Sequence, residues 1–536
     1  MDTLSSPKAP SRAVIIGGGL AGMVAANELL KQKIPVLLLE KERRTGGKAG
    51  ADLVNGVFEE HGYHVFPTFY ANTLALIDEI GASNNLVPIT KFHYLLAPDT
   101  KPKQGRGVYP NSIVFLQPDS ISAAVKDTFS GIIPWYEFIL FFYAMIDLCS
   151  QPNKSRRFLD QVSVTGFIRS RWYRSDIIAD FHQQTVLQAS AIPSYDLSAM
   201  TMKHLVQHWC GKLKPLFRIL NGNLQQKFIE PLEKEIRRNG CEIKFNTSVT
   251  EILTDGEKLC GLKLESADSA TIAVERLNPS DICIIATPHE VTSTFFNDSV
   301  CQCDDRSVAH PDTHSLGFVN NLESAPMAAF QFYLNRKIPA LPPQHVNLFE
   351  SKFGLSFIDV SQTWQGLPNT TLSVIASDFR SLRGISDDEA RDHIFKELQR
   401  FVPELKERDI ERVHPEQNIR TPLFLNTVGA WHFRPATRTR IKNLYIAGDY
   451  CRTRADLTTM ESAVISGRQT AASVLEDAGL DPTPAKPIRL SRPYWRFKFY
   501  KWAGLPFALL LRGIVLLSAL IKDLVTGNFS LRKWLD

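Results

Sequence analysis

The first apolar runs of the chain are separated by a helical pattern. Residues 14–16 form a short unbroken apolar run, residues 23–31 have helical spacing, and residues 36–39 form a second apolar run that ends at Glu40. Such short apolar runs are typical of strands buried on both faces of a parallel sheet. The pattern therefore predicts a strand–helix–strand unit and an α/β fold.

Later segments extend this pattern. Buried strands are predicted within 241–252 and 281–288, the latter closing the sheet, and a further strand begins the stretch 443–471. Alternating apolar and polar residues within 328–377 predict antiparallel strands. Residues 131–149 are apolar all round, with Pro134 as the expected first helical residue; we interpret them as a buried helix, or alternatively as the wall of an apolar passage. Further helices are predicted at 73–80, 158–209, 220–240, 387–401 and from Thr458 or Thr459.

The last apolar segment, residues 505–527, predicts an amphipathic helix. Pro506 suits its first turn and Gly527 its C-terminal cap. Arg512, Ala519 and Asp523 lie opposite its apolar face on a helical wheel, and that face consists of Phe507, Leu510, Ile514, Leu517, Ile521 and Val525. Cations and aromatic residues cluster just before it, as in segments that bind a membrane interface. We therefore favour a helix lying sideways in a membrane surface over one docked on the protein's own core.

Composition narrows the possible partners and location. The net charge of +5 over 536 residues is small, which argues against nucleic acid as a partner. Eight cysteines without a paired framework suit a reducing compartment. Residues 1–12 are polar and predict no signal peptide. We expect a peripheral, monotopic protein on the cytoplasmic side of a membrane.

Glycines follow the first apolar run in a spacing that suits a dinucleotide. Gly17 permits a tight turn, Gly19 lets backbone amides approach a pyrophosphate, and Gly22 lets the helix pack on the strand. Glu40 lies about twenty residues further on, where an acid binds a ribose hydroxyl. The alternative is a strand-to-helix turn without a ligand, but the complete strand, helix, strand and acid context favours the dinucleotide.

A second glycine pair, Gly46 and Gly47, follows Glu40. With the first motif, this pair resembles the flavoprotein amine oxidase and carotenoid desaturase superfamily, in which it lies along the flavin end of FAD. Two more segments are similar to the plant and cyanobacterial type carotene desaturases. One carries Gly62, His64, Phe66, Tyr70 and Asn72, and the other carries Arg434, Pro435, Gly448, Asp449, Met460 and Glu461.

The resemblance implies one non-covalent FAD and a set of residues around it. Val249 would contact the adenine through its backbone, Asp449 the ribityl-phosphate region, and the amides near Met460 the flavin pyrimidine edge. For His64, contact with flavin and a simple buried histidine are weighed equally. The full set of expected FAD-binding residues is Gly17, Gly19, Leu20, Ala21, Gly22, Glu40, Lys41, Gly46, Gly47, Lys48, His64, Val249, Gly448, Asp449 and Met460.

The implied fold is a Rossmann-like FAD-binding domain assembled from discontinuous segments, with an α+β substrate domain and a C-terminal amphipathic helix. The FAD-binding domain is expected at 12–95, 215–295 and 425–480. The substrate domain is expected at 96–214 and 296–424, and the membrane-associating segment at 487–536.

Two kinds of reactive site receive no support from the sequence. Cys301, Cys303, His310 and His314 could ligate zinc, but their order matches no zinc signature, and we interpret them as part of an exposed insertion. We therefore expect no metal. No nucleophile triad or acid–base pair is visible, so no catalytic residue is named; this fits chemistry carried by a flavin.

The leading functional hypothesis is an FAD-dependent desaturase that acts on a long apolar isoprenoid such as a carotene precursor, with a quinone or oxygen as electron acceptor. A dehydroxylase of the hydroxysqualene type or a flavin-dependent polyene isomerase is the alternative within enzymes. A prenyl-binding escort protein without redox chemistry is the alternative outside them; Glu40, Gly46, Gly47 and Asp449 argue against it.

Overall fold

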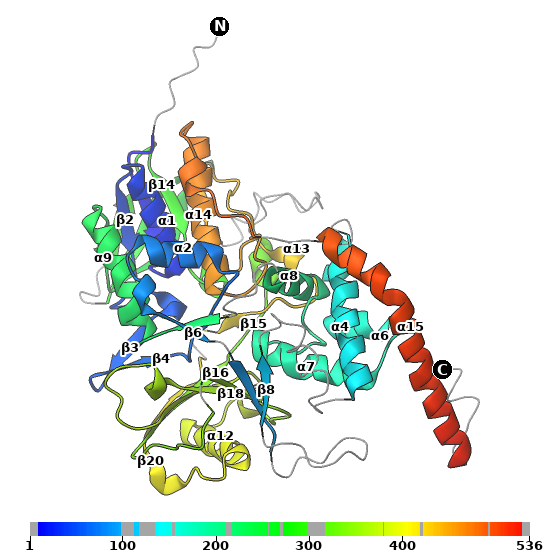
Figure 1. The fold of residues 1–536 in the computed structure, drawn as a ribbon. Helices are drawn as coiled ribbons and strands as arrows, with labels where there is room; N and C mark the ends of the chain where they lie inside the picture. Colours follow the sequence, from blue (N-terminus) through cyan, green and yellow to red (C-terminus); the bar gives the residue numbers. More distant parts are fainter. Residues whose placement is uncertain are drawn as a thin grey trace.

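The computed structural model describes thirteen stretches of the chain. They are residues 9–89, 91–97, 112–116, 134–152, 156–210, 217–255, 257–267, 272–296, 317–342, 344–378, 380–418, 422–490 and 494–527. In Figure 1 a parallel sheet with its helices, a second sheet and a group of helices lie side by side, and the last helix runs along the outside.

A five-stranded parallel sheet joins stretches that are far apart in the sequence. Its middle strand carries Ile15 between Leu38 and Ile284 of its neighbours. The α/β expectation is thus confirmed, but the strand predicted at 281–288 lies inside the sheet and does not close it. The order is β10 (Glu242–Lys244), β2 (Val36–Leu39), β1 (Ala13–Ile16), β14 (Ile282–Ile285) and β22 (Leu444–Ile446).

Helices α1 (Leu20–Lys31) and α14 (Met460–Asp477) pack against each other beside this sheet. A Cβ atom on Gly467 of α14 would lie 2.5 Å from the Ala21 carbonyl oxygen of α1, so only glycine permits this approach. Helix α1 begins at Leu20, three residues before its predicted start, directly after the glycine turn. Thr459 caps α14 by accepting a hydrogen bond from the Ser462 amide, as the sequence indicated.

The single strand predicted over 241–252 is in fact two strands. Asn246 has φ of 52°, and the chain turns there between β10 and β11 (Thr247–Thr254). Asparagine tolerates this left-handed conformation better than most residues. β11 then leaves the parallel sheet and pairs antiparallel with β12 (Leu259–Ser266), which in turn pairs with β13 (Ile272–Arg276).

A seven-stranded sheet forms the other large layer, covered by α12 (Asp387–Phe401). Its antiparallel strands and the exact span of α12 agree with the expectations for 328–377 and 387–401; one neighbouring pair, β17 and β7, is parallel. The order is β20 (Ile410–Glu416), β16 (Ala328–Leu334), β19 (Thr371–Ala376), β18 (Leu355–Asp359), β17 (His345–Leu348), β7 (Lys91–Leu95) and β8 (Ser112–Leu116).

Short elements link the two sheets. The hairpin of β3 (Ala51–Val54) and β4 (Val57–Glu60) is followed by β5 (Phe66–Pro67) and by α2 (Ala71–Glu79), which Gly81 terminates with φ of 72°. β5 and β6 (Leu86–Ile89) both pair with β9 (Phe217–Leu220). After β9 a π-helical turn at Gln225–Ile229 leads into α9 (Glu230–Arg238), so the helix predicted within 220–240 begins directly after the turn at 221–223, as expected.

The helical group lies beside the seven-stranded sheet (Figure 1). The strongly apolar segment forms α4 (Trp135–Ser150), most of whose residues are buried, which supports the buried-helix interpretation. Pro134 is its cap and not its first helical residue. The remaining members are α5 (Arg156–Asp160), α6 (Val164–Arg169), α7 (Asp176–Ser190), α8 (Ala199–Trp209) and, from a later part of the chain, α13 (Ala430–Phe433).

The C-terminal helix α15 (Tyr494–Val525) is longer than predicted and contains Pro506 in its interior. Its first half packs on α4, where Lys501 Nζ lies 2.7 Å from Asp147 Oδ1. Every residue of the predicted apolar face is exposed, and Leu509, Leu516 and Leu524 widen that face. The helix is long and apolar enough to cross a membrane, and only 11% of its most apolar 18-residue stretch is buried.

Candidate functional site: a glycine cradle at the end of the parallel sheet

Two of the three motif glycines are fixed by their contacts with backbone. Gly17 has φ of 103°, and a Cβ atom there would lie 2.8 Å from the Ala286 carbonyl oxygen. A Cβ atom on Gly22 would lie 2.2 Å from the Gly17 carbonyl oxygen. Both positions therefore hold the turn between β1 and α1 in one tight shape, as the spacing predicted.

Gly19 differs from the other two motif glycines, Gly17 and Gly22, because a Cβ atom there would meet no atom within 4 Å. Gly19 is also the N-terminal cap of α1, with an ordinary φ of −68°, so the fold itself does not require glycine here. The first amides of a helix lack partners within it, and Leu20 and Ala21 supply these amides. The open side of Gly19 is thus the place where a phosphate group can approach the helix terminus.

The second glycine pair lies directly on this turn. The Gly46 amide donates to the Gly18 carbonyl at 2.8 Å, and a Cβ atom on Gly47 would lie 3.2 Å from the Gly19 Cα. Both residues have positive φ, 101° and 54°. The structure therefore brings together two glycine motifs that the sequence separates, and we call residues 17–22 with Gly46 and Gly47 the glycine cradle.

Glu40 closes one side of the cradle at the end of β2. Its Oε2 accepts a hydrogen bond from the Gly18 amide at 2.6 Å, and its Oε1 accepts one from the Glu42 amide at 2.9 Å. Burial raises the pKa of the Glu40 carboxyl, while these two hydrogen bonds oppose the rise. The acid predicted to bind a ribose hydroxyl is therefore held rigidly against the motif.

Three predicted residues lie around this core in different environments. The Thr247 amide donates to the Glu40 carbonyl, which places β11 and the half-buried Val249 close to the acid. Lys41 points to solvent and pairs with Glu42. Lys48 donates to the Pro422 carbonyl, so its side chain ties the second glycine pair to a distant part of the chain.

Gly448 and Asp449 follow the edge strand β22. The Gly448 amide donates to Ser466 Oγ of α14 at 2.9 Å. Arg434, fully buried, donates to the carbonyls of Asp449, Tyr450 and Cys451 and pairs with Asp456 Oδ1 at 2.6 Å. One buried guanidinium thus shapes the loop between β22 and α14. The sequence placed Arg434 beside Pro435 in the resembling segment but did not reveal this role.

The start of α14 is fixed by a buried carboxylate. Glu461 accepts four hydrogen bonds, two from the amide and side chain of Asn72 and two from the amide and hydroxyl of Thr73. Asn72 also bonds the backbone of Ile488. Asn72, part of the pattern expected around the flavin, therefore holds the N-terminus of α2 to that of α14, next to Met460.

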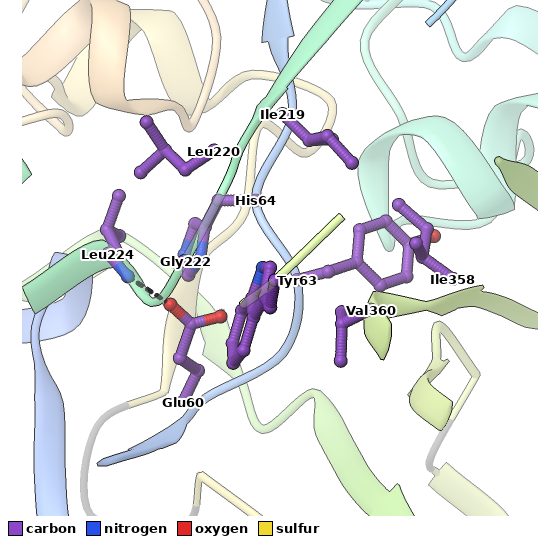
Figure 2. A pocket seen from close by; sticks show the side chains of 10 residues that line it. Glu60, Tyr63, His64, Ile219, Leu220, Gly222, Leu224, Ile358 and Val360 are labelled. Carbon is purple, nitrogen blue, oxygen red and sulfur yellow. Dashed lines mark hydrogen bonds between the residues drawn. The ribbon is translucent and has the colours of Figure 1, made fainter. Parts of the chain in front are cut away.

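The turn from Gly62 to Phe66 borders a small cavity of about 20 Å³ (Figure 2). Glu60 and His64 point into it, and Glu60 accepts a hydrogen bond from the Leu224 amide. Burial raises the Glu60 pKa to about 8 and lowers the His64 pKa to about 4. Both side chains are therefore uncharged at neutral pH. The apolar part of the cavity wall consists of Ile219, Leu220, Leu224, Ile358, Val360 and the ring of Trp364.

Metal chemistry finds no support in the described ranges, which contain no group of three or more histidine, cysteine or acidic side chains that could hold an ion. Cys301, Cys303, His310 and His314 lie outside the described residues.

Comparison of the sequence with known protein families assigns the chain to one of them. The profile of the family described as "Flavin containing amine oxidoreductase" matches residues 20–475. The chain belongs to this family. It is therefore an FAD-dependent oxidoreductase, and the open cradle at Gly19 fits the dinucleotide cofactor that the family carries.

Relatives at low identity have names from carotene metabolism. A probable zeta-carotene desaturase of Synechococcus elongatus is 23% identical over 508 residues, covering 87% of this chain and 98% of the relative. A 15-cis-phytoene desaturase of an Oncidium hybrid cultivar is 23% identical over 492 residues, covering 88% and 79%. The family resemblance inferred from the sequence is thus confirmed.

Solved structures share the fold. Putrescine oxidase bound to putrescine superposes with a TM-score of 0.62 at 15% identity, covering 87% of this chain and 99% of that one. An oxidoreductase from Methanosarcina mazei superposes with a TM-score of 0.60 at 17% identity, covering 87% and 100%. At this identity the likeness establishes the fold and says nothing about the substrate.

Sequence reasoning missed several residues that shape the site. Glu60 stands four positions before His64 but carries no motif, and only its burial makes it unusual. His204 and Asp456, whose side chains lie 2.7 Å apart, come from α8 and the loop before α14. Glu60, His204 and Asp456 stand in polar or mixed stretches, so no local signal marked them, and only the fold buries them.

Proposed function

We propose that the protein desaturates a long apolar isoprenoid, removing a hydride and a proton from adjacent carbons. The observation that carries this proposal is the uncharged, apolar surrounding of the Gly62–Phe66 turn. Burial raises the Glu60 pKa and lowers the His64 pKa, so this turn offers a hydrocarbon an uncharged, largely aliphatic surface. The cavity of about 20 Å³ beside it has room for about one water molecule and is not itself the substrate site. The names of the desaturase relatives point to the same substrate class.

The glycine cradle would hold the cofactor. Amides at Gly19, Leu20 and Ala21 would bind the pyrophosphate, Glu40 a ribose hydroxyl, and the backbone of Val249 the adenine. Gly46, Gly47 and Lys48 would lie along the flavin end, with Gly448 and Asp449 at the ribityl-phosphate region. Lys41, which points to solvent, would contribute through its backbone.

Bound FAD supplies the acceptor for the hydride. The chain's own contribution is position and local charge. The amides at the start of α14, near Met460, would direct partial positive charge at the flavin pyrimidine edge. Glu461 fixes that helix terminus through its four hydrogen bonds, and Arg434 fixes the loop that precedes it. Because rate depends on alignment, such rigid supports serve catalysis without touching the substrate.

We further propose that α15 places the enzyme on a membrane surface, where an apolar substrate is dissolved. The exposed face of α15 consists of large aliphatic and aromatic side chains. Arg512 Nη2 donates to the Arg174 carbonyl, so the middle of the helix is held against the helical group. This contact favours a helix lying in a membrane interface over one that crosses the bilayer. The cytoplasmic leaflet stays our expectation from the cysteine content.

Anaerobic mixing of the FAD-loaded enzyme with a panel of isoprenoids tests the reaction. Desaturation requires bleaching of the flavin absorbance and an equal amount of a product two hydrogens lighter. A product of unchanged mass would replace the proposal with isomerisation, and loss of water would replace it with dehydroxylation. Reoxidation of the bleached enzyme by a quinone or by oxygen then identifies the electron acceptor.

A further inference from the structure

A second and much larger cavity, of about 450 Å³, lies between α5, α8, α13 and the loop that leads to α14. This volume falls within the range of small-molecule sites. None of its lining residues belongs to the FAD-binding set, and the Gly62–Phe66 turn does not border it. The proposed desaturation makes no use of it.

Four cationic side chains line this cavity: Arg156, Lys203, Arg452 and Arg454. The described lining includes no aspartate or glutamate. Two buried acids lie behind the wall. Asp456 is shared between Arg434 at 2.6 Å and His204 at 2.7 Å, and Asp160 accepts a hydrogen bond from Ser198 Oγ at 3.1 Å. The four lining cations still outnumber these two acids. The cavity therefore has an excess of positive charge, which attracts anions.

One side of the same cavity is apolar. Leu159 and Met200 are buried beneath it, and the Trp431 ring lies under the Arg156 guanidinium, 3.7 Å from the ring centroid. Stacking on Trp431 holds the Arg156 charge over an apolar surface. The site thus combines charge recognition with a hydrophobic wall, as an amphiphilic ligand requires.

The cavity also lies near the C-terminal helix. Lys203 Nζ donates to the carbonyl of Gln151, the residue that ends α4, at 2.7 Å. One turn earlier on α4, Asp147 pairs with Lys501 of α15. The basic cavity is therefore close to the part of α15 where the exposed aromatic residues Trp495, Phe499 and Trp502 lie.

We propose that this cavity binds an amphiphile with a phosphate head group, the phosphate between Arg156, Arg452 and Arg454 and the first carbons of the chain against the half-buried Trp431. Arginine suits a phosphate because its planar guanidinium donates two parallel hydrogen bonds. The phosphate can belong to a soluble phosphorylated lipid or to the head group of a membrane phospholipid, and the test separates these sources.

The test uses the FAD-loaded full-length protein and two probes. Binding of n-octyl phosphate is measured by calorimetry, with inorganic phosphate and the uncharged octyl glucoside for comparison. Binding to phosphatidylcholine vesicles is measured with and without one-fifth phosphatidylglycerol. The variant is Arg156→Gln with Arg454→Gln, since both side chains are exposed; the control is Arg237→Gln with Arg238→Gln on α9, which removes the same charge from another surface.

A soluble ligand predicts that octyl phosphate binds wild type and control, and that the cavity variant loses at least about tenfold in affinity, as expected when charged hydrogen bonds are removed. A lipid head group predicts that only the anionic vesicles respond, with the cavity variant weakened and the control unchanged. Equal binding by variant and control to every probe overturns the proposal, as does binding of octyl glucoside as tight as that of octyl phosphate. Unchanged flavin absorbance in both variants shows that the fold is intact.

Discussion

The glycine cradle and the C-terminal helix are built on opposite principles. In the cradle, backbone meets backbone so closely that Gly17 and Gly22 admit no side chain, and Gly467 of the neighbouring α14 admits none against α1. On α15, by contrast, most apolar side chains are exposed, and only a few, such as Ala508 and Leu511, are buried where the helix packs on α4. A close-packed region can present backbone amides in one fixed arrangement, whereas an exposed apolar region suits a deformable surface such as a membrane.

Gly22→Ala should give the largest change, because it adds a methyl group 2.2 Å from the Gly17 carbonyl oxygen. Neither atom belongs to a flexible side chain, so the turn must shift. We expect the free energy of unfolding to fall by about 3 kcal/mol, measured by urea denaturation, with loss of FAD.

The control for this variant is Gly513→Ala. Gly513 lies in α15, where an added Cβ meets no atom within 4 Å. Alanine should stabilise that helix by up to about 1 kcal/mol. Equal effects of the two substitutions would show that close packing does not distinguish the cradle from α15.

The cradle is the part of the fold that spacing alone could predict. The glycines, the lengths of the strands and Glu40 are local features of the sequence. Each follows from one steric or electrostatic requirement of the turn or of the buried strands. The limits of α15 could not be predicted in the same way. Pro506 reads as a helix start, yet the chain continues as helix on both sides because α4 packs along its first half. Tertiary contact thus overrides the local signal.

The second prediction concerns the exposed face of α15. Leu510→Glu combined with Leu517→Glu places charge on two side chains that are 62% and 57% exposed, so folding should be unaffected. Partitioning into liposomes should fall at least about tenfold, because two apolar side chains no longer enter the lipid. Flotation with vesicles measures the effect.

Leu53→Glu with Ile272→Glu is the matched control for α15. These residues are 63% and 74% exposed on short strands elsewhere. Membrane binding should stay at the wild-type level in this variant. If both double variants lose binding equally, the contact depends on net charge and not on α15.

The third prediction is a pH dependence at Glu60. Its pKa in the folded protein, about 8, is higher than its ordinary value of 4.5. The folded state therefore binds an extra proton between these values, and the stability this proton provides is lost as pH rises toward 8. Glu60→Gln keeps an acceptor for the Leu224 amide and should lose less stability than wild type between pH 5 and pH 8.5. Urea denaturation measures the free energy of unfolding of both proteins at the two pH values. If wild type and Glu60→Gln lose the same amount of it between pH 5 and pH 8.5, Glu60 is already ionised in the folded protein.

Much of the candidate site was visible in the sequence, but its supports were not. Arg434 stands in the same resembling segment as Gly448 and Asp449, but its burial and its contact with the Asp449 carbonyl, fifteen residues further on, could not be predicted. His64 was weighed equally as a flavin contact and a buried histidine; in the structure it is half-buried, and its contact with flavin stays a prediction, as do the domain boundaries. The burial and the contacts of these side chains depend on segments that are distant in the sequence, so a local pattern cannot predict them.

The most direct measurement is the flavin content of Gly19→Val. The fold should tolerate this change, because the added Cβ atom meets no atom within 4 Å and the φ of −68° suits any residue. The valine would occupy the place where the pyrophosphate approaches the amides of α1. We predict an unfolding free energy of the apoprotein within about 1 kcal/mol of wild type, together with loss of bound FAD from the absorption spectrum. Full FAD occupancy in a folded Gly19→Val protein would contradict the account of the cradle.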